Sequence, residues 1–512
     1  MAVNGNEPKR KRMNKMEDRL SSLHDDILVE ILSRLPLRLA MATGCLSRRW
    51  CSLWTKVTSI HIDNHKFNCS HDLETTFNDI ITRITSPFIH SFSVELGLHQ
   101  IYLTLHHFPY VEYPERIFNY SWLYRICDRN VRELKVTNTC REGTYPDIYY
   151  YNWIQSRFSL PSCICVTQSL VSIELDTTLK LQLPDHGDQI NLPNLNKLHL
   201  CSTSLNLESL EKLIKACPSL EELGFVYKSF SNPFKHGWDR SGLISLCNIK
   251  FSHQRLQRLF IKNLPCNYRV VLNAPKLEYL AIHASKSVGF RFEEEPVISC
   301  EAKIRLTKYT DCDCALTEDE IKSMTKFYGV FSNVTILSPE VFVLMNSWPS
   351  NMFCNATRLT LSMDMPSNVK ILLAILELCP VLDVLVLKIQ DTEGMEIRDA
   401  EMPCQVGTWQ RVLKKVNIEI NCNSNGKTTN SFVKLVEYLL SNSVDLKQFH
   451  IKVNWSCYEM ANEIREMKLC MIVYHGPVLS EGCEVEFVGR FFKMSRKADL
   501  KDWITNGKDV SR

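Results

Sequence analysis

One short pattern of apolar and polar positions recurs along most of the chain. It has the form Leu-x-x-Leu-x-Leu, or a close variant, and runs from about residue 59 to the C-terminal region. Its clearest copies begin at Val131, Leu170, Leu195, Leu220, Leu256, Leu277, Ala356, Leu382, Leu413 and Leu446. Within each copy, apolar residues two positions apart predict a short strand with one buried face. The chain is therefore expected to consist of repeated strand units.

The spacing of the copies identifies the kind of repeat. The interval from Ile173 to Leu198 is 25 residues, as is that from Leu198 to Leu223, and Leu259 to Leu280 spans 21. A period of about 20–29 residues with this phrase is typical of leucine-rich repeats. Weaker strands near Ile304 and at 334–336 would fill the long gap before the copy at Ala356.

The residues between copies predict the outer layer. Helical periodicity is present at 207–216, 369–378 and 432–440, and the next phrase follows within a few residues. The junctions Cys217-Pro-Ser-Leu and Cys379-Pro-Val-Leu are nearly identical. The expected fold class is α/β, with residues 59–455 forming a solenoid of short parallel strands inside and helices or loops outside.

The N-terminal segment has a different, helical pattern. Apolar residues recur at helical spacing, at Leu23, Ile27, Leu28, Ile31, Leu32 and Leu35. Asp25 and Asp26 are expected at the N-cap and in the first turn, and Pro36 is expected to end the helix. Further short helices are predicted over 39–43 and from about Ser47. Three helices in so few residues bury too little core to be stable alone, so this segment is expected to need a partner.

Two blocks in this segment resemble an F-box: Leu-x-Asp-Asp-Ile-Leu-x-x-Ile-Leu-Ser-x-Leu-Pro at 23–36 and Leu-Ser-Arg-Arg-Trp-x-x-Leu-Trp at 46–54. The resemblance implies that residues 20–58 dock on a Skp-type adapter, which connects to a cullin and a RING subunit. The adapter-binding residues it implies are Leu23, His24, Ile27, Leu28, Ile31, Leu35, Pro36, Leu46 and Trp50. His24 replaces the usual Pro of the pattern. Gly44 lies where Thr is usual and is expected to weaken the second helix by about 1 kcal/mol relative to Ala.

An F-box followed by this repeat resembles the plant F-box/leucine-rich-repeat proteins. Residues 409–455 look like part of the FBD tail that some of them carry, without its Trp-rich first half. The resemblance implies a non-catalytic adaptor of a Skp–cullin–F-box E3 ubiquitin ligase, whose repeats bind a protein substrate. The alternative is a leucine-rich-repeat scaffold that sequesters a partner without ligase assembly.

Strand geometry predicts which residues such a substrate would meet. Residues flanking the buried leucines point to the other face of the sheet. On neighbouring predicted strands this face carries Arg258, Phe260 and Tyr279. Aromatic and Arg side chains dominate the energetics of many interfaces, so these three are the candidate substrate-binding residues. An exposed aromatic pair without a ligand is equally consistent with the pattern.

Composition and charge exclude other classes. Of 512 residues, 45% are hydrophobic and 23% charged, as in folded proteins. The net charge of +3 is matched by the basic excess within residues 1–20, so the remainder is neutral and nucleic acid is not an expected partner. Residues 1–19 are expected to be a basic leader, in which 8–12 resembles a nuclear import signal or a solvated tail. Residues 456–512 are expected to form a C-terminal cap or tail.

Cysteine usage and hydropathy predict the compartment. The 21 cysteines include no Cys-x-x-Cys pair, which argues against zinc fingers of the RING type. No secretion signal is recognisable, which favours thiols in a reducing compartment. The most apolar window, 371–387, is interrupted by Glu377, Pro380 and Asp383 and is not expected to cross a membrane. The expected location is the nucleus, the cytoplasm or both.

Three fragments suggest other chemistry but lack essential parts. Gly-Lys-Thr at 426–428 follows a predicted strand, but the first Gly of a phosphate loop would have to be at position 421, which is Asn. His61, Asp63 and His65 share one strand face without a fourth metal ligand. The Asp and Cys residues of 311–314 are interpreted as a solvated loop. No catalytic residue, metal or cofactor is expected.

Overall fold

The structure is a computed structural model, and its residues form two compact units, Met1–Gly143 and Thr144–Arg512. It describes residues 20, 22–63, 73–96, 121–138, 159–177, 180–181, 190–202, 207–227, 247–264, 268–285, 289–294, 301–307, 327–339, 353–365, 369–391, 408–422, 430–455, 460–476 and 478–497. The two units are considered separately.

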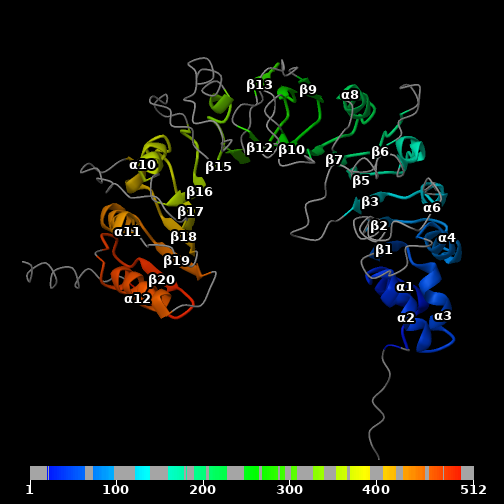
Figure 1. Ribbon diagram of the computed structural model, residues 1–512, viewed down its shortest axis with the longest axis horizontal. Coiled ribbons are helices and arrows are strands. Elements are labelled where there is room, and N and C mark those ends of the chain that lie inside the picture. Colours follow the sequence, from blue (N-terminus) through cyan, green and yellow to red (C-terminus); the bar gives the residue numbers. More distant parts are fainter. Residues whose placement is uncertain are drawn as a thin grey trace, which may run out of the picture. The chain divides into compact units, whose positions relative to one another are not determined.

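The first unit begins with the helical box and continues into parallel strands (Figure 1). Its elements are α1 (Asp25–Ser33), α2 (Leu37–Ala42), the 3-10 turn η1 (Thr43–Cys45), α3 (Trp50–Leu53), the 3-10 turn η2 (Trp54–Lys56), β1 (Ser59–Asp63), α4 (Leu73–Arg83), β2 (Ser91–Leu96), α6 (Ser121–Cys127) and β3 (Glu133–Asn138). Strands β1, β2 and β3 are parallel, with Ile60, Phe92 and Leu134 in register. All three side chains are buried, so alternation places the apolar side of these three strands in the core.

The box helices are close to those predicted. Helix α1 ends at Ser33, three residues before Pro36, which is the N-cap residue of α2. A proline cannot continue a helix but suits its start, since its fixed φ is helical and its missing N–H would lack a helical partner. The N-cap residue of α1 lies one position before the one expected from the sequence. His24 occupies it in extended conformation, and Asp25 and Asp26 lie in the first turn, where their charges favour the helix dipole.

The second unit is the repeat. Its strands are β4 (Ser159–Leu160), β5 (Ser172–Thr177), β6 (Lys180–Leu181), β7 (Lys197–Ser202), β8 (Glu222–Tyr227), β9 (Cys247–Ser252), β10 (Arg258–Leu264), β11 (Tyr268–Asn273), β12 (Tyr279–Ser285), β13 (Gly289–Phe292), β14 (Glu301–Thr307), β15 (Ile336–Pro339), β16 (Arg358–Met365), β17 (Val384–Asp391), β18 (Lys415–Cys422), β19 (Gln448–Trp455), β20 (Glu484–Val488) and β21 (Lys493–Lys497). Its helices are α8 (Leu207–Lys215), α10 (Val369–Glu377), α11 (Asn430–Asn442) and α12 (Met460–His475), with 3-10 turns η4 (Ser162–Val166) and η6 (Thr408–Arg411).

The main sheet confirms the predicted solenoid. Its strands from β5 to β20 are parallel neighbours in chain order, and β6, β9, β11 and β13 belong to other sheets. Among the described strands of the main sheet, only β21 is antiparallel. The central residues of four predicted copies, Leu198, Leu223, Leu259 and Leu280, are in one register and at most 1% exposed. Each repeat thus stacks its strand leucines on those of the previous one. The weaker strands expected near Ile304 and 334–336 are β14 and β15.

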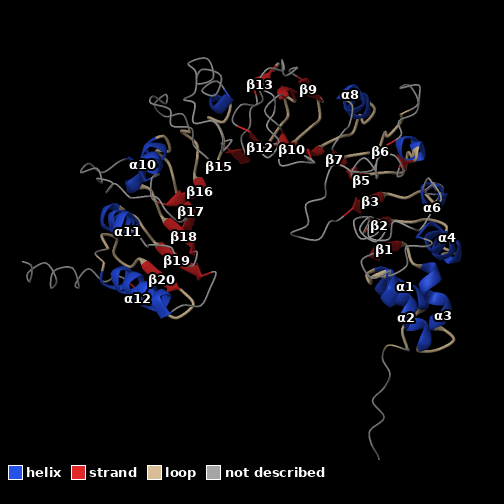
Figure 2. Cartoon of the chain, viewed as in Figure 1, coloured by secondary structure: helices blue, strands red, loops and turns tan. Residues whose placement is uncertain are grey.

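The outer layer differs from the prediction in one region. Helices α8, α10 and α11 lie where helical periodicity was found, along one side of the strands (Figure 2). Between β8 and β14, however, the described outer elements are strands: β9, β11 and β13 form a separate parallel sheet. Within the 21-residue interval from Leu259 to Leu280, the outer element is the strand β11.

The repeat geometry continues beyond residue 455, the boundary expected from the sequence. Strand β20 is parallel to β19, with Phe449 opposite Val485 and Ile451 opposite Phe487. The first leucine of the phrase is replaced by Gly482, which has a φ of +74°. The repeat at β20 therefore lacks the Leu-x-x-Leu-x-Leu phrase, although its strand keeps the alternation of buried and less buried residues.

Candidate functional site: two protein-binding surfaces

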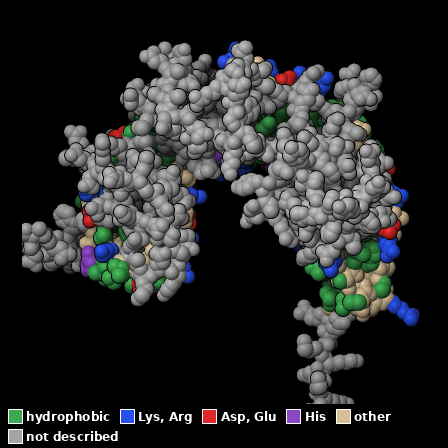
Figure 3. Space-filling view, viewed as in Figure 1, with side chains coloured by type: hydrophobic (Ala, Val, Ile, Leu, Met, Phe, Trp, Pro, Cys, Tyr) green, Lys and Arg blue, Asp and Glu red, His purple; other side chains and the backbone are tan. Residues whose placement is uncertain are grey.

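The box leaves several apolar side chains exposed, as the hydrophobic surface at the lower right of Figure 3 shows. They are Leu20 at 45%, Ile27 at 49%, Ile31 at 38%, Leu39 at 55% and Leu46 at 61% exposure. We call these five residues the box apolar face. Isolated exposed apolar residues are ordinary, but such a group within one small module is typical of an interaction site.

The structure divides the expected adapter-binding residues into surface and core. Ile27, Ile31 and Leu46 belong to the box apolar face, His24 and Pro36 are exposed, and Leu23 and Leu35 are half-buried. Leu28 is fully buried and Trp50 is 5% exposed, so neither presents a docking surface. Ile27 and Ile31 share one side of α1, whereas Leu28 lies about 100° further round the helix and points inward. Sequence reasoning missed Leu20 and Leu39 as surface residues.

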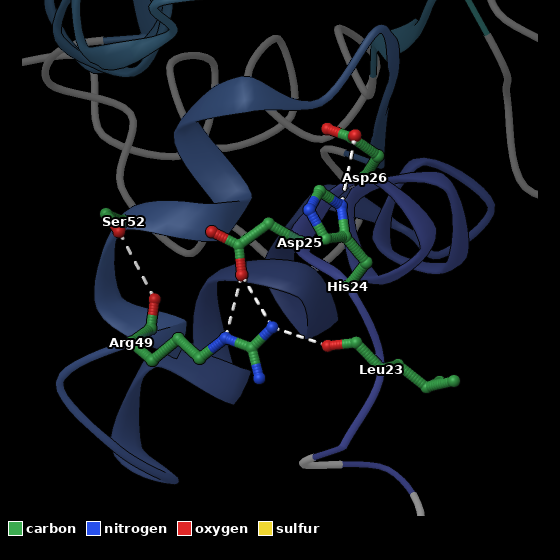
Figure 4. A network of polar contacts seen from close by, with 6 residues as sticks. All are labelled: Leu23, His24, Asp25, Asp26, Arg49 and Ser52. Atoms are coloured by element: carbon green, nitrogen blue, oxygen red, sulfur yellow. Dashed lines mark hydrogen bonds and ion pairs between the residues drawn. The ribbon is translucent and has the colours of Figure 1, made fainter.

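A polar network around Arg49 joins the start of α1 to α3 (Figure 4). Its Nε donates to Asp25 Oδ1 at 2.7 Å, and its Nη2 donates to the Leu23 carbonyl at 2.5 Å. The hydrogen bond from Arg49 holds the pKa of the Asp25 carboxyl below its ordinary value. The His24 ring points to the Asp26 carboxylate instead, with 3.1 Å between Nδ1 and Oδ2. Arg49 thus positions the helix that carries Ile27 and Ile31.

A second surface lies on the main sheet of the repeat unit, at five neighbouring strands. One row across β7, β8, β10, β12 and β14 consists of Lys197, Glu222, Arg258, Tyr279 and Glu301. The parallel row two residues on consists of His199, Gly224, Phe260, Ala281 and Lys303. We call these ten residues the charged-aromatic rows. The sequence pattern predicted that Arg258, Phe260 and Tyr279 share one face, and the register confirms it.

Glu222 is the centre of the polar contacts. Its carboxylate lies 3.1 Å from Lys197 Nζ, 2.7 Å from His199 Nε2 and 3.3 Å from Arg258 Nε. Partial burial opposes ionisation, but the hydrogen bonds and charges of Lys197 and His199 prevail and hold the pKa of Glu222 below its ordinary value. Burial, together with the charge of Lys197, lowers the pKa of His199. His199 is half-buried, and Glu222 holds its ring in place.

Gly224 is required by this arrangement. A Cβ at this position would lie 2.8 Å from His199 Cδ2, so the imidazole ring occupies the space of a side chain. The ring meets Phe260 edge-on with 5.6 Å between centroids. The missing side chain at 224 therefore lets His199 join the aromatic group.

The three candidate substrate-binding residues are in contact, but only two are accessible. Phe260 and Tyr279 have ring centroids 4.9 Å apart. The Arg258 guanidinium lies 4.7 Å from the Tyr279 centroid, and Lys303 Nζ lies 5.4 Å from it. Tyr279 was expected at the surface. These contacts cover it instead and leave only 8% of it exposed. An incoming molecule would meet Arg258, Lys303 and part of Phe260.

The chain thus combines a helical box with a solenoid of short parallel strands. Residues 20–61 match the F-box domain, and residues 120–305 match the family described as FBD-associated F-box protein At5g56370, LRR repeats. The Arabidopsis thaliana F-box/FBD/LRR-repeat protein At5g22660 is 27% identical over 492 residues, covering 92% of this chain and 97% of the relative. Another from the same plant, At5g22700, is 25% identical over 488 residues, covering 93% and 99%. This chain carries an F-box and FBD-associated leucine-rich repeats, as the sequence predicted.

The remaining candidate chemistry gains no support from the structure. Neither of the two matching family models describes an enzyme family. Within the described ranges, no group of three or more His, Cys, Asp or Glu side chains is placed to hold a metal ion, and no helix is long and apolar enough to cross a membrane. His61 lies on β1, while His65, 311–314, 426–428 and the basic leader lie outside the described residues.

Proposed function

We propose that this protein is the substrate-recognition subunit of a Skp–cullin–F-box ubiquitin ligase. The box apolar face docks on a Skp-type adapter, the adapter connects the chain to a cullin and a RING subunit, and the repeats hold a protein substrate. The partner subunits supply the chemistry, so the chain itself is not catalytic. The observation that carries the proposal is a group of exposed apolar side chains on a module that matches the F-box.

The docking step is tested by Ile27→Asp and Leu46→Asp, each assayed for affinity to a purified Skp-type adapter. Burying one such side chain contributes about 1.5–3 kcal/mol, so each variant should weaken binding by about tenfold or more. Because both side chains are exposed, thermal stability should change little. Phe88→Asp is the matched control, since Phe88 is 55% exposed in the same unit but outside the box. Wild-type affinity in both box variants would contradict docking through this face.

Leu28→Asp serves as a different comparison. Leu28 is fully buried, so a charge there should unfold the box and abolish binding indirectly. Loss of binding without loss of helix content in this variant would mean that Leu28 itself reaches the adapter.

Ligase assembly separates this proposal from the scaffold alternative. A ligase subunit should co-purify with the adapter and also with the cullin, and deletion of the box should make its substrate accumulate. A sequestering scaffold would hold its partner with no such accumulation. Nuclear or cytoplasmic location, where such ligases meet their substrates, remains a prediction of the same proposal.

A further inference from the structure

Helix α12 has apolar side chains on two opposite sides. One side packs inward through Leu469 and Val473, which are 4% and 1% exposed. The other carries Ile464, Met467, Met471 and Tyr474, which are 54%, 45%, 50% and 44% exposed. At about 100° per residue these four fall on one side of the helix. We call them the α12 stripe; hydrophobic side chains are visible in this region at the lower left of Figure 3.

The chain leaves its last described strand beside one end of this stripe. Arg496, the second-last residue of β21, donates from Nη2 to the carbonyls of Val473 at 3.2 Å and Gly476 at 2.7 Å. Its guanidinium lies 5.7 Å from the ring centroid of Tyr474. The segment that follows Lys497 therefore starts next to a stripe residue.

That segment, 498–512, lies outside the described residues, but its sequence is amphipathic. Leu500, Trp503 and Ile504 have helical i, i+3, i+4 spacing, with charged residues between them at 501 and 502 and before them at 499. Asn506-Gly507 is a typical helix stop. Trp503 is six residues beyond Lys497, a distance of about 9 Å as helix or about 20 Å extended. The stripe spans about 15 Å, so the segment can reach it.

We propose that residues 498–507 pack on the α12 stripe of the same chain as an amphipathic helix, with Leu500, Trp503 and Ile504 against it. The short tether keeps the segment at high effective concentration beside the stripe. Flexible Met side chains adapt readily to a packed aromatic ring. The last unit of a solenoid needs a polar outer side for solubility, and this segment would provide it. The inference is independent of adapter docking and of the ligase proposal.

Oxidation of Met467 and Met471 by hydrogen peroxide, followed by mass spectrometry of the full-length protein, tests the packing. In the wild type both should be oxidised slowly. Deletion of 498–512, and separately Trp503→Asp, should accelerate the oxidation of both several-fold. Lys501→Asp is the matched control, because residue 501 lies on the polar side of the segment, and it should leave the rates unchanged.

Two further measurements make the result decisive. A benzophenone photo-cross-linker at position 503 should couple within one chain to the α12 peptide, and the same group at 501 should not. The deletion should reduce the far-UV circular dichroism by no more than the signal of the removed helix; if the loss is larger, Trp503→Asp alone is compared. Equal oxidation rates with and without the segment would overturn the proposal. So would protection that is lost on dilution, which would show that a second copy of the chain covers the stripe.

Discussion

Gly44 in the F-box is a glycine that the backbone does not require. It lies in η1 without a positive φ, and a Cβ there would meet only Cys51, at 3.6 Å or more. The sequence comparison with the F-box pattern indicated a cost at this position, and the structure shows that an added methyl group has room.

Gly44→Ala should therefore stabilise the box by about 0.4–1 kcal/mol, because it restricts the unfolded chain without straining the folded one. Native-state hydrogen exchange of the α1 and α2 amides measures the change directly. Adapter affinity should not decrease. Slower folding or faster exchange in the variant would show that the 3-10 turn depends on glycine.

At the scale of elements, one buried carboxylate connects the last pieces of the repeat. Glu466 on α12 is fully buried and accepts a hydrogen bond from the Trp455 indole at 2.7 Å. It also accepts three backbone N–H groups of the β20–β21 turn, at 3.1, 2.7 and 2.7 Å, from Arg490, Phe491 and Phe492. This single side chain therefore connects α12 to the end of β19 and to the turn before the antiparallel strand β21.

Gly489→Ala should disrupt this junction. A Cβ at 489 would overlap the Glu466 carboxylate and displace it from its donors. Each hydrogen bond to a charged group contributes about 1.5–3 kcal/mol, so the loss should amount to several kcal/mol. The expected result is a lower thermal midpoint and faster hydrogen exchange confined to α12, β20 and β21.

Gly329→Ala is the control for the glycine substitution, because no atom lies within 4 Å of a Cβ at that position. If Gly489→Ala left exchange in β21 unchanged, the Glu466 junction would not be what holds the antiparallel strand.

At the scale of the whole molecule, the repeated strands form one sheet face. A few positions on this face carry aromatic and charged side chains that contact one another. Arg258 is at the centre of the charged-aromatic rows, where its guanidinium covers Tyr279 and contacts Glu222. Arg358, on β16 of the same sheet, has the same exposed position in its strand phrase. Comparing variants of the two arginines therefore distinguishes a specific binding site at Arg258 from a general effect of charge on this face.

Arg258→Glu should reduce capture of a trapped substrate in co-immunoprecipitation, with adapter binding unchanged. Arg358→Glu should retain capture, since no described aromatic ring is stacked on that side chain. Tyr279→Ala is unsuitable for this test, because truncating a buried aromatic residue costs about 3–5 kcal/mol of stability. Equal capture by both Arg variants would move the substrate site to the inter-repeat loops.

The repeated strands, their register and the helical box could all be predicted from the sequence alone. These depend on local alternation and spacing, which every copy of the phrase carries within a few residues. The sequence also identified Ile27 and Ile31 as docking candidates through helical spacing and the F-box pattern, and Leu46 through the F-box pattern alone. Adapter docking itself remains a prediction.

Which apolar residues are covered could be learned from the folded structure but not from the sequence pattern. Leu28 and Tyr279 were candidates for binding surfaces, but one points into the box core and the other lies beneath Arg258 and Lys303. The outer sheet of β9, β11 and β13 and the Glu466 junction likewise had no sequence signal. Burial and hydrogen bonding of this kind depend on neighbours from other elements, and spacing along one segment contains no information about them.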